Sequence, residues 1–310
     1  MTNIVDVQTA TELSLSKAGI RTRLEGEIAR DGEVMEAMFE ASMALYRWSA
    51  QHDIDLGDEP SLVVHEAMLL VMALDERREL ISALAGQLSH LFERDDKADA
   101  IELANRVLVV LADADLFDIE YVSYDDEDEE TGQMITEEYY YITNPWEVSD
   151  TTAQLMQRAM FLPPMVCKPA HLTHNRSNPL LTGEDKSLIL GKFNHHDGDI
   201  CLDTLNIANG VAMSLSIEML KGITDSLLIP KKLQVELKRD PKRKEQYDKF
   251  MRDSADVYAY LVKNGNRFYL THKPDKRGRK YASGYHANTQ GDVFRKSIVE
   301  LHNKEVVDGF

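Results

Sequence analysis

The chain has few cysteines, few tryptophans and no long uninterrupted apolar run. Its 310 residues include two cysteines, Cys167 and Cys201, and two tryptophans. Two cysteines are too few for a disulfide framework or a four-thiolate zinc site, and they fit a reducing compartment. The longest apolar stretch runs from residue 62 to residue 74 and contains His65 and Glu66, so it is too short to cross a bilayer. We therefore expect no membrane-spanning segment.

Common targeting and enzyme motifs are also absent from the sequence. The N-terminus lacks a basic start followed by an apolar block, so no secretory signal is expected. No dinucleotide-binding, P-loop, nucleophile-elbow or zinc-protease motif occurs. The segment His195–Asp199 contains two histidines and two aspartates, which are possible metal ligands. Adjacent side chains point in different directions, however, so we interpret it as a polar loop and expect no metal site.

Basic residues are scarce over most of the chain and gather near its end. The whole sequence has 35 Lys and Arg against 53 Asp and Glu, a net charge of −18. Residues 1–230 have 16 basic and 42 acidic residues, a net charge of −26, whereas residues 231–310 have 19 and 11, a net charge of +8. The acidic part repels nucleic acid and the basic part can bind it. Two ordinary solvated surfaces are the alternative interpretation.

The apolar pattern predicts an α+β fold that is predominantly α-helical. Hydrophobic residues make up 43% of the chain, and the first 115 residues show mainly helical spacing. Alternating Ile and Tyr on either side of an acidic run predict a β-hairpin over about residues 116–142, whose tip is a solubilising loop or a site for a basic partner. Further elements are a short strand at 267–270 and helices at 151–160, 202–219, within 231–263, and at 293–302.

The most informative segment lies between Thr271 and Tyr281, where five cations occur within eleven residues. Gly278 lets the backbone approach a phosphate closely. Asp275 can pair with Arg279 or Arg277 and hold a guanidinium fork that binds phosphate at two points. Tyr281 can stack on a sugar or a base, as can Tyr285 nearby. An exposed basic turn is the alternative interpretation.

This segment resembles a motif of a known family. The run Asp275–Ala282 (DKRGRKYA) looks like the DxxGR motif of single-subunit, phage-type RNA polymerases. Downstream, Asn288–Asp292 (NTQGD) followed by Arg295 is similar to the family's Asn-x-Gln-Gly stretch and its following basic residue.

Two further landmarks of the same family lie upstream. Leu116–Glu120, before a hairpin, and then Pro164–Pro169 (PMVCKP) resemble the lead into the family's PMxxxP segment, and Asp203–Ala208 resembles the helix before its thumb. The four landmarks occur in the family's order between Leu116 and Lys304. The aromatic residue that usually follows the prolines is missing.

The resemblance covers only the first part of such a polymerase. The family places its two metal-binding aspartates, catalytic lysine and nucleotide-selecting tyrosine beyond the position that corresponds to Phe310. N-four-like phages divide a polymerase of this type between two chains, and this sequence resembles the N-terminal chain. It is expected to have an acidic N-terminal domain over 1–230, short basic thumb-like helices over 231–263, and the start of a palm over 264–310.

The resemblance therefore implies a non-catalytic subunit of a heterodimeric DNA-dependent RNA polymerase, a nucleotidyltransferase that is inactive without its partner chain. It implies no cofactor in this chain and Mg²⁺ in the partner's active site. Template DNA and the RNA–DNA hybrid are further expected partners, together with a recruiting or single-stranded-DNA-binding protein. The expected location is the cytoplasm of an infected bacterial host.

The resemblance also implies roles for individual side chains. Arg279 would contact the backbone of the template or hybrid, Asp275 would orient Arg279, and Tyr281 would pack against a sugar or base. The full expected set of nucleic-acid-binding residues is Asp275, Lys276, Arg277, Gly278, Arg279, Tyr281, Gln290 and Arg295. A different hypothesis is a non-enzymatic phage protein whose basic tail binds single-stranded DNA.

Overall fold

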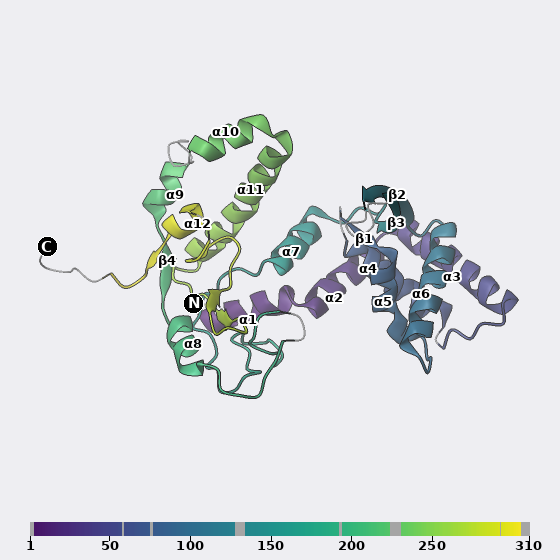
Figure 1. Cartoon of the computed structure of the whole chain (residues 1–310), viewed down its shortest axis with the longest axis horizontal. Coiled ribbons are helices and arrows are strands. Elements are labelled where there is room, and N and C mark those ends of the chain that lie inside the picture. Colours follow the sequence, from purple (N-terminus) through teal and green to yellow (C-terminus); the bar gives the residue numbers. More distant parts are fainter. Residues whose placement is uncertain are drawn as a thin grey trace, which may run out of the picture. The chain divides into compact units, whose positions relative to one another are not determined.

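A computed structural model describes residues 3–57, 59–74, 77–127, 134–191, 194–223, 231–291 and 293–304. The chain is α+β and predominantly helical, as the sequence predicted (Figure 1). Contacts divide it into two compact units, Lys17–Met156 and Met1–Ser16 with Gln157–Phe310. The first unit has 10 basic and 33 acidic residues, a net charge of −23, and the second has 25 and 20, a net charge of +5. We call them the acidic unit and the basic unit.

This division differs from the boundary at residue 230 that the charge pattern suggested. Residues 157–230 pack with the later segment because both contribute to one core: Val166 and Leu215 are buried together with Leu261 and Phe268. The division by contacts still leaves an acidic and a basic part, although the charge difference between them is smaller than for a cut at residue 230.

Helices form most of the acidic unit. Asp31 begins α3 by accepting hydrogen bonds from the N–H groups of Glu33 and Val34, and Asp96 caps α6 in the same way. Pro60 occupies the first turn of α4, where its missing N–H is not needed. The helices are α2 (Lys17–Ile28), α3 (Gly32–Gln51), α4 (Pro60–Met72), α5 (Ile81–Leu88), the 3₁₀ turn η1 (Ser89–Leu91), α6 (Lys97–Asp113) and α7 (Asp150–Met160), which continues into the other unit.

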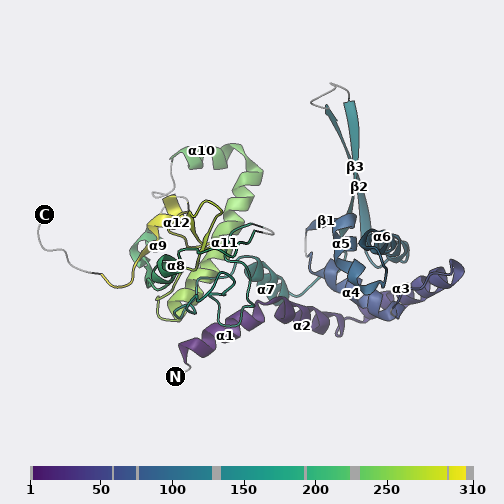
Figure 2. The same cartoon turned by 60° about the horizontal axis from the view of Figure 1, so that its bottom comes forward.

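The predicted β-hairpin is confirmed in the acidic unit. Strands β2 (Asp118–Glu127) and β3 (Met134–Thr143) are antiparallel, and β1 (Arg78–Leu80) pairs with β3 to give the order β1-β3-β2. Buried Phe117 and Ile142 attach the base of the hairpin to the core. The two strands extend as a ribbon beyond the helices of this unit (Figure 2). The acidic tip at residues 128–133 lies outside the described residues.

The basic unit contains short helices and two-stranded sheets. Its helices are α1 (Ile4–Ser14), α8 (Leu202–Asn209), α9 (Ile217–Ile223), α10 (Lys231–Arg239), α11 (Pro241–Lys263) and α12 (Val293–Ser297). Among the described residues, β4 (Met213–Leu215) pairs with β7 (Val299–Leu301), and β5 (His272–Pro274) pairs with β6 (Lys280–Ala282). On α11, the apolar side chains of Val257, Tyr258 and Leu261 are buried.

Three sequence predictions in this unit were wrong. The helix expected over 202–219 stops at Asn209, and the helix expected over 293–302 stops at Ser297. Both stop because the following residues pair with each other as β4 and β7, a long-range contact that local spacing does not encode. The strand expected over 267–270 is reduced to single bridges, Phe268 with Met213 and Tyr269 with Met165.

The N-terminal helix α1 is held in the basic unit by buried polar side chains. Gln8 accepts a hydrogen bond from the N–H of Val166 at 2.8 Å, and Glu12 accepts one from the N–H of Thr182 at 2.7 Å. Because α1 satisfies backbone donors of two irregular segments, it fixes the proline-rich segment at 163–169 and the loop that follows. In the described part of the chain, no helix has both the length and the apolarity to cross a membrane.

Candidate nucleic-acid interface

The cationic segment forms a tight turn between β5 and β6. The N–H of Asp275 donates to the carbonyl of Arg279, and the N–H of Gly278 donates to the carbonyl of Asp275, each at 2.9 Å. Gly278 has φ +79°. A three-residue hairpin loop of this kind is a type I turn followed by one left-handed residue, with Asp favoured at its first position. The D-x-x-G part of the motif is therefore what this turn requires.

The carboxylate of Asp275 organises the turn and the arginine that follows it. Its Oδ1 accepts the backbone N–H groups of Arg277 and Arg279, both at 2.9 Å, and its Oδ2 accepts Nε of Arg279 at 2.8 Å. The hydroxyl of Tyr281 also donates to Oδ2, at 3.4 Å. The pairing between Asp275 and Arg279 that the sequence predicted is confirmed. Arg277 pairs with the same carboxylate at 3.3 Å.

In this turn the arginine side chains are exposed to solvent, whereas the carboxylate of Asp275 is partly buried. The side chain of Asp275 is 16% exposed, whereas those of Arg279 and Arg277 are 54% and 71% exposed. Partial burial raises the pKa of Asp275, but the N–H and guanidinium of Arg279 lower it more, so its pKa lies below the ordinary value. Asp275 in turn raises the pKa of Arg279. The turn presents a fixed guanidinium fork, a suitable donor for an anion with two acceptor oxygens.

The two faces of the β5–β6 ribbon have different surroundings. His272 and Pro274 are buried, and His272 Nδ1 lies 3.0 Å from the side-chain oxygen of Asn209 at the end of α8. Alternation along the strands places Asp275, Arg279 and Tyr281 on the opposite face. The guanidinium of Arg279 lies 5.6 Å from the centre of the Tyr281 ring. This outward face carries the candidate interface.

Gln290, in the second sequence motif (Asn288–Asp292), stabilises this ribbon through hydrogen bonds. Its Oε1 accepts the N–H of Ala282 at 2.7 Å, and its Nε2 donates to the carbonyl of Lys280 at 2.9 Å. Asn288 donates to the carbonyl of Ala282 at 3.1 Å. Gln290 therefore acts on the edge of β6, and its predicted contact with nucleic acid stays a prediction.

We expect Gln290→Ala to loosen the ribbon without changing its charge. The amide of Ala282 would lose its acceptor, and its hydrogen exchange should become about two- to tenfold faster, the range set by one net hydrogen bond. Hydrogen-exchange mass spectrometry of the 272–282 peptide measures this. Gln290→Glu keeps the acceptor for Ala282, so rapid exchange in both variants would contradict the assigned contact.

Arg295 contacts a cluster of aromatic side chains and not the Asp275 turn. Its guanidinium lies over the rings of Phe250 and Tyr285, 4.7 and 4.6 Å from their centres. Phe161 stacks on Tyr285 at 4.0 Å between ring centres. Lys276, by contrast, is exposed at the tip of the turn. The structure thus brings Asp275, Arg277, Gly278, Arg279 and Tyr281 together, with Gln290 behind them and Arg295 in an aromatic cluster.

Segments far apart in the sequence meet at this ribbon. Met165 of the proline-rich segment exchanges two backbone hydrogen bonds with Tyr269, at 2.8 and 3.1 Å, three residues before β5. Asn209 of α8 contacts His272. Asn209 and His272 were not predicted as site residues, because a buried polar pair leaves no local signal in the sequence. Their contact fixes the inner face of the ribbon whose outer face carries the cations.

We expect Gly278→Ala to destabilise the turn. A Cβ at this position would meet no atom within 4 Å, so the cost comes from the positive φ alone and should be roughly 1–2 kcal/mol. Gly278→Asn should cost less, since Asn tolerates this conformation better. Denaturant unfolding measures the difference. Lys276→Ala is the matched control. Any residue can fill this position of the turn, so the substitution should leave stability unchanged.

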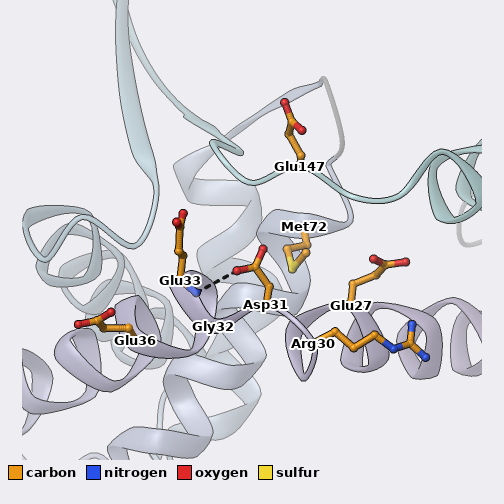
Figure 3. Close-up of a pocket in the computed structure, with 8 residues that line it drawn as sticks. All are labelled: Glu27, Arg30, Asp31, Gly32, Glu33, Glu36, Met72 and Glu147. Carbon is orange, nitrogen blue, oxygen red and sulfur yellow. Dashed lines mark hydrogen bonds between the residues drawn. The ribbon is translucent and has the colours of Figure 1, made fainter.

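A pocket in the acidic unit has the opposite character. It has a volume of about 660 Å³, and five carboxylates and Arg30 line it (Figure 3). The carboxylate of Asp31 caps α3. Glu27 accepts hydrogen bonds from Ser149 and Thr152, and these lower the pKa of Glu27, the Ser149 bond most. Such a lining repels phosphate. We therefore place the candidate interface on the basic unit.

The histidine-rich loop shows no arrangement suited to a metal ion. His195 Nε2 lies 3.0 Å from a side-chain oxygen of Asp197. Within the described ranges, no three His, Cys, Asp or Glu side chains gather into a possible metal-binding group.

Comparison with known proteins gives no family for this chain. No protein-family model matches it, and no curated protein does so significantly. The Asp275–Tyr281 turn, the residues that support it and the sequence resemblance are therefore the basis for a functional proposal.

Proposed function

We propose that this chain is the non-catalytic N-terminal subunit of a heterodimeric, phage-type DNA-dependent RNA polymerase. In this proposal it binds template DNA and the RNA–DNA hybrid beside an active site whose aspartates and Mg²⁺ belong to a second chain. The complex is a nucleotidyltransferase in the cytoplasm of an infected bacterium.

One observation carries the proposal: sequence landmarks that were matched separately pack around one ribbon. Met165 of the proline-rich segment bonds Tyr269, three residues before the ribbon. Asn209, directly after the Asp203–Ala208 landmark, contacts His272 in β5, and Gln290 of the second motif bonds β6. The turn at its centre holds Arg279 in a fixed geometry with its guanidinium in solvent. A chance match to a five-residue motif would not require these segments to meet.

The role of each turn residue follows from this geometry. Arg279 contacts a phosphate of the template or hybrid, since a guanidinium fork matches two phosphate oxygens. Asp275 is a positioning residue because its carboxylate holds that fork. Tyr281 lies beside it and packs against a sugar or base, and Lys276 and Arg277 add phosphate contacts. Backbone contacts of this kind hold a hybrid by shape and charge, without reading its sequence.

The remaining parts of the basic unit fit the same proposal. Helices α10 and α11 act as a reduced thumb, and the segment from residue 264 begins the palm. Sheets of two strands are marginal on their own and leave open edges. The β4–β7 and β5–β6 pairs are such sheets among the described residues, and the partner chain extends them.

The acidic unit limits how this polymerase reaches DNA. With a net charge of −23, it repels duplex DNA at a distance. We therefore include a recruiting or single-stranded-DNA-binding protein among the partners, or DNA that is already open.

The competing function is a non-enzymatic phage protein that binds single-stranded DNA. The exposed cations at Lys276, Arg277 and Arg279 serve either function. The two differ in their need for a partner chain.

Co-expression with a candidate partner tests the proposal. The candidate is the product of a neighbouring gene. Its sequence should match the polymerase family from just after the DxxGR region onward and should carry the two metal aspartates. We expect a stable complex of one copy of each chain by size-exclusion chromatography with light scattering. Absence of such a gene product, together with full function of this chain alone in single-strand binding, would favour the competing function.

A further inference from the structure

The outward face of the β5–β6 ribbon carries a cation that the Asp275 turn does not use. Lys273 is opposite Tyr281 in the strand register, so strand alternation places it on the same face as Asp275 and Arg279. Lys273 is half-buried, whereas Lys276 at the tip is exposed. A partly buried ammonium group is costly unless a negative charge or hydrogen-bond acceptor faces it.

A neighbouring loop brings a second ammonium group to this place. The N–H of Leu190 donates to the carbonyl of Pro274 at 2.8 Å, and Leu188 and Ile189 are buried, so the loop is fixed alongside β5. The same loop carries Lys186. Burial lowers the pKa of Lys273, and the positive charge of Lys186 lowers it further.

The two lysines have little counter-charge of their own. In the part of the chain that the structure describes, no ion pair joins Lys273 to a carboxylate. Lys186 lies 3.8 Å from Glu184 with both side chains largely exposed, and such a pair contributes little. Lys273 and Lys186 thus lie on neighbouring segments, close enough to repel each other, and neither has a buried counter-charge among the ion pairs of the described residues. An anion between them would remove their repulsion.

We infer that Lys273 and Lys186 form a second phosphate-binding position beside Arg279, and that its ligand is a phosphodiester of a nucleic-acid backbone. The inference rests on the proposed function, which places a strand across this face of the ribbon. Arg279 holds one phosphate through its fork, and the two lysines hold another as point charges. The site thereby extends from the turn to the loop at residues 182–191.

Nuclear magnetic resonance of ¹³C-dimethylated lysines tests this inference on the full chain, because dimethylation keeps the charge. The signals of Lys273 and Lys186 are assigned by their loss in Lys273→Arg and Lys186→Arg. We expect the oligonucleotide dT12 to shift both signals and to raise the pKa of Lys273. Inorganic pyrophosphate, at an equal phosphate concentration, should shift them less. The signal of Lys263, exposed at the end of α11, should stay in place.

Binding measurements supply the second readout. Lys273→Gln should weaken dT12 binding several-fold and lower the dependence of log K on log salt by about one phosphate contact. Lys263→Gln removes the same charge elsewhere in the unit and should change neither quantity. Because both variants remove one lysine charge, a difference between them reports position and not net charge.

The outcomes separate this inference from the proposed function. If dT12 binds in an Arg279-dependent way but Lys273→Gln binds as tightly as wild type, the lysine site is refuted and the proposed function stands. Equal shifts with pyrophosphate would overturn the assignment to a nucleic-acid backbone. If neither dT12 nor an RNA–DNA hybrid binds and Arg279 variants have no effect, the proposed function itself fails.

Discussion

Arg279→Lys should lower transcription by the two-chain complex about ten- to hundredfold, although it keeps the positive charge. Lysine is a point charge and cannot make the two parallel hydrogen bonds of a guanidinium fork, nor can it reproduce the Nε contact with Asp275. The expected range is that of a charge-assisted hydrogen bond. The measurement is elongation and retention of short transcripts on a single-stranded template at two salt concentrations.

Two variants show whether geometry or charge causes this loss. Asp275→Asn should resemble Arg279→Lys, because the carboxylate that orients the guanidinium loses its charge. Lys276→Ala should only weaken nucleic-acid binding modestly, with a smaller salt dependence by about one contact. If Arg279→Lys behaves as wild type while Lys276→Ala does not, the turn is an ordinary basic surface and Arg279 has no special role.

Stability should fall as the pH falls from about 6.5 to about 4, because two buried histidines resist protonation. Burial first, and then the charge of Lys280, lowers the pKa of His272 to about 4. Burial and the charge of Arg295 lower the pKa of His286 to about 4. The unfolded chain binds these protons near pH 6.5. The folded chain therefore keeps its full stability above pH 6.5 and loses on the order of 3 kcal/mol per histidine toward pH 4.

Histidine titration by nuclear magnetic resonance and denaturant unfolding at pH 7.5 and 5 check this expectation. His272→Asn and His286→Asn assign the two imidazole signals, and Asn retains an amide near the position of Nδ1, which faces Asn209 and Ser254 respectively. Each variant should show a smaller loss of stability between the two pH values than wild type. Titration of both signals near pH 6.5 in the folded chain would contradict the buried environments.

Local sequence signals predicted the local elements well. Alternating Ile and Tyr around an acidic run gave the β2–β3 hairpin, since a strand exposes every second side chain. The pairing of Asp275 with Arg279 was also predictable, because a turn places residues four apart within reach of one short side chain. The helices of the acidic unit follow from caps such as Asp31 and Asp96 and from 3.6-residue spacing.

Local sequence signals could not predict which distant segments pair with each other. The β4–β7 pair joins residues more than eighty positions apart and ends two expected helices early. The contact of Asn209 with His272, which fixes the inner face of the ribbon, is also long-range. The charge pattern placed a boundary at residue 230 because it counts residues along the chain, whereas contacts group α1 with residues 157–310. In each case the deciding partner lies far away in the sequence.

Nucleotide incorporation by the separate and combined chains tests the central claim most directly. The assay contains a single-stranded template, Mg²⁺ and labelled nucleoside triphosphates, with this chain alone, the partner alone, or both. We expect RNA synthesis only when both chains are present, and about ten- to hundredfold less of it when Arg279→Lys replaces the wild-type chain. Robust synthesis by this chain alone, or by the partner alone at the rate of the complex, would contradict it.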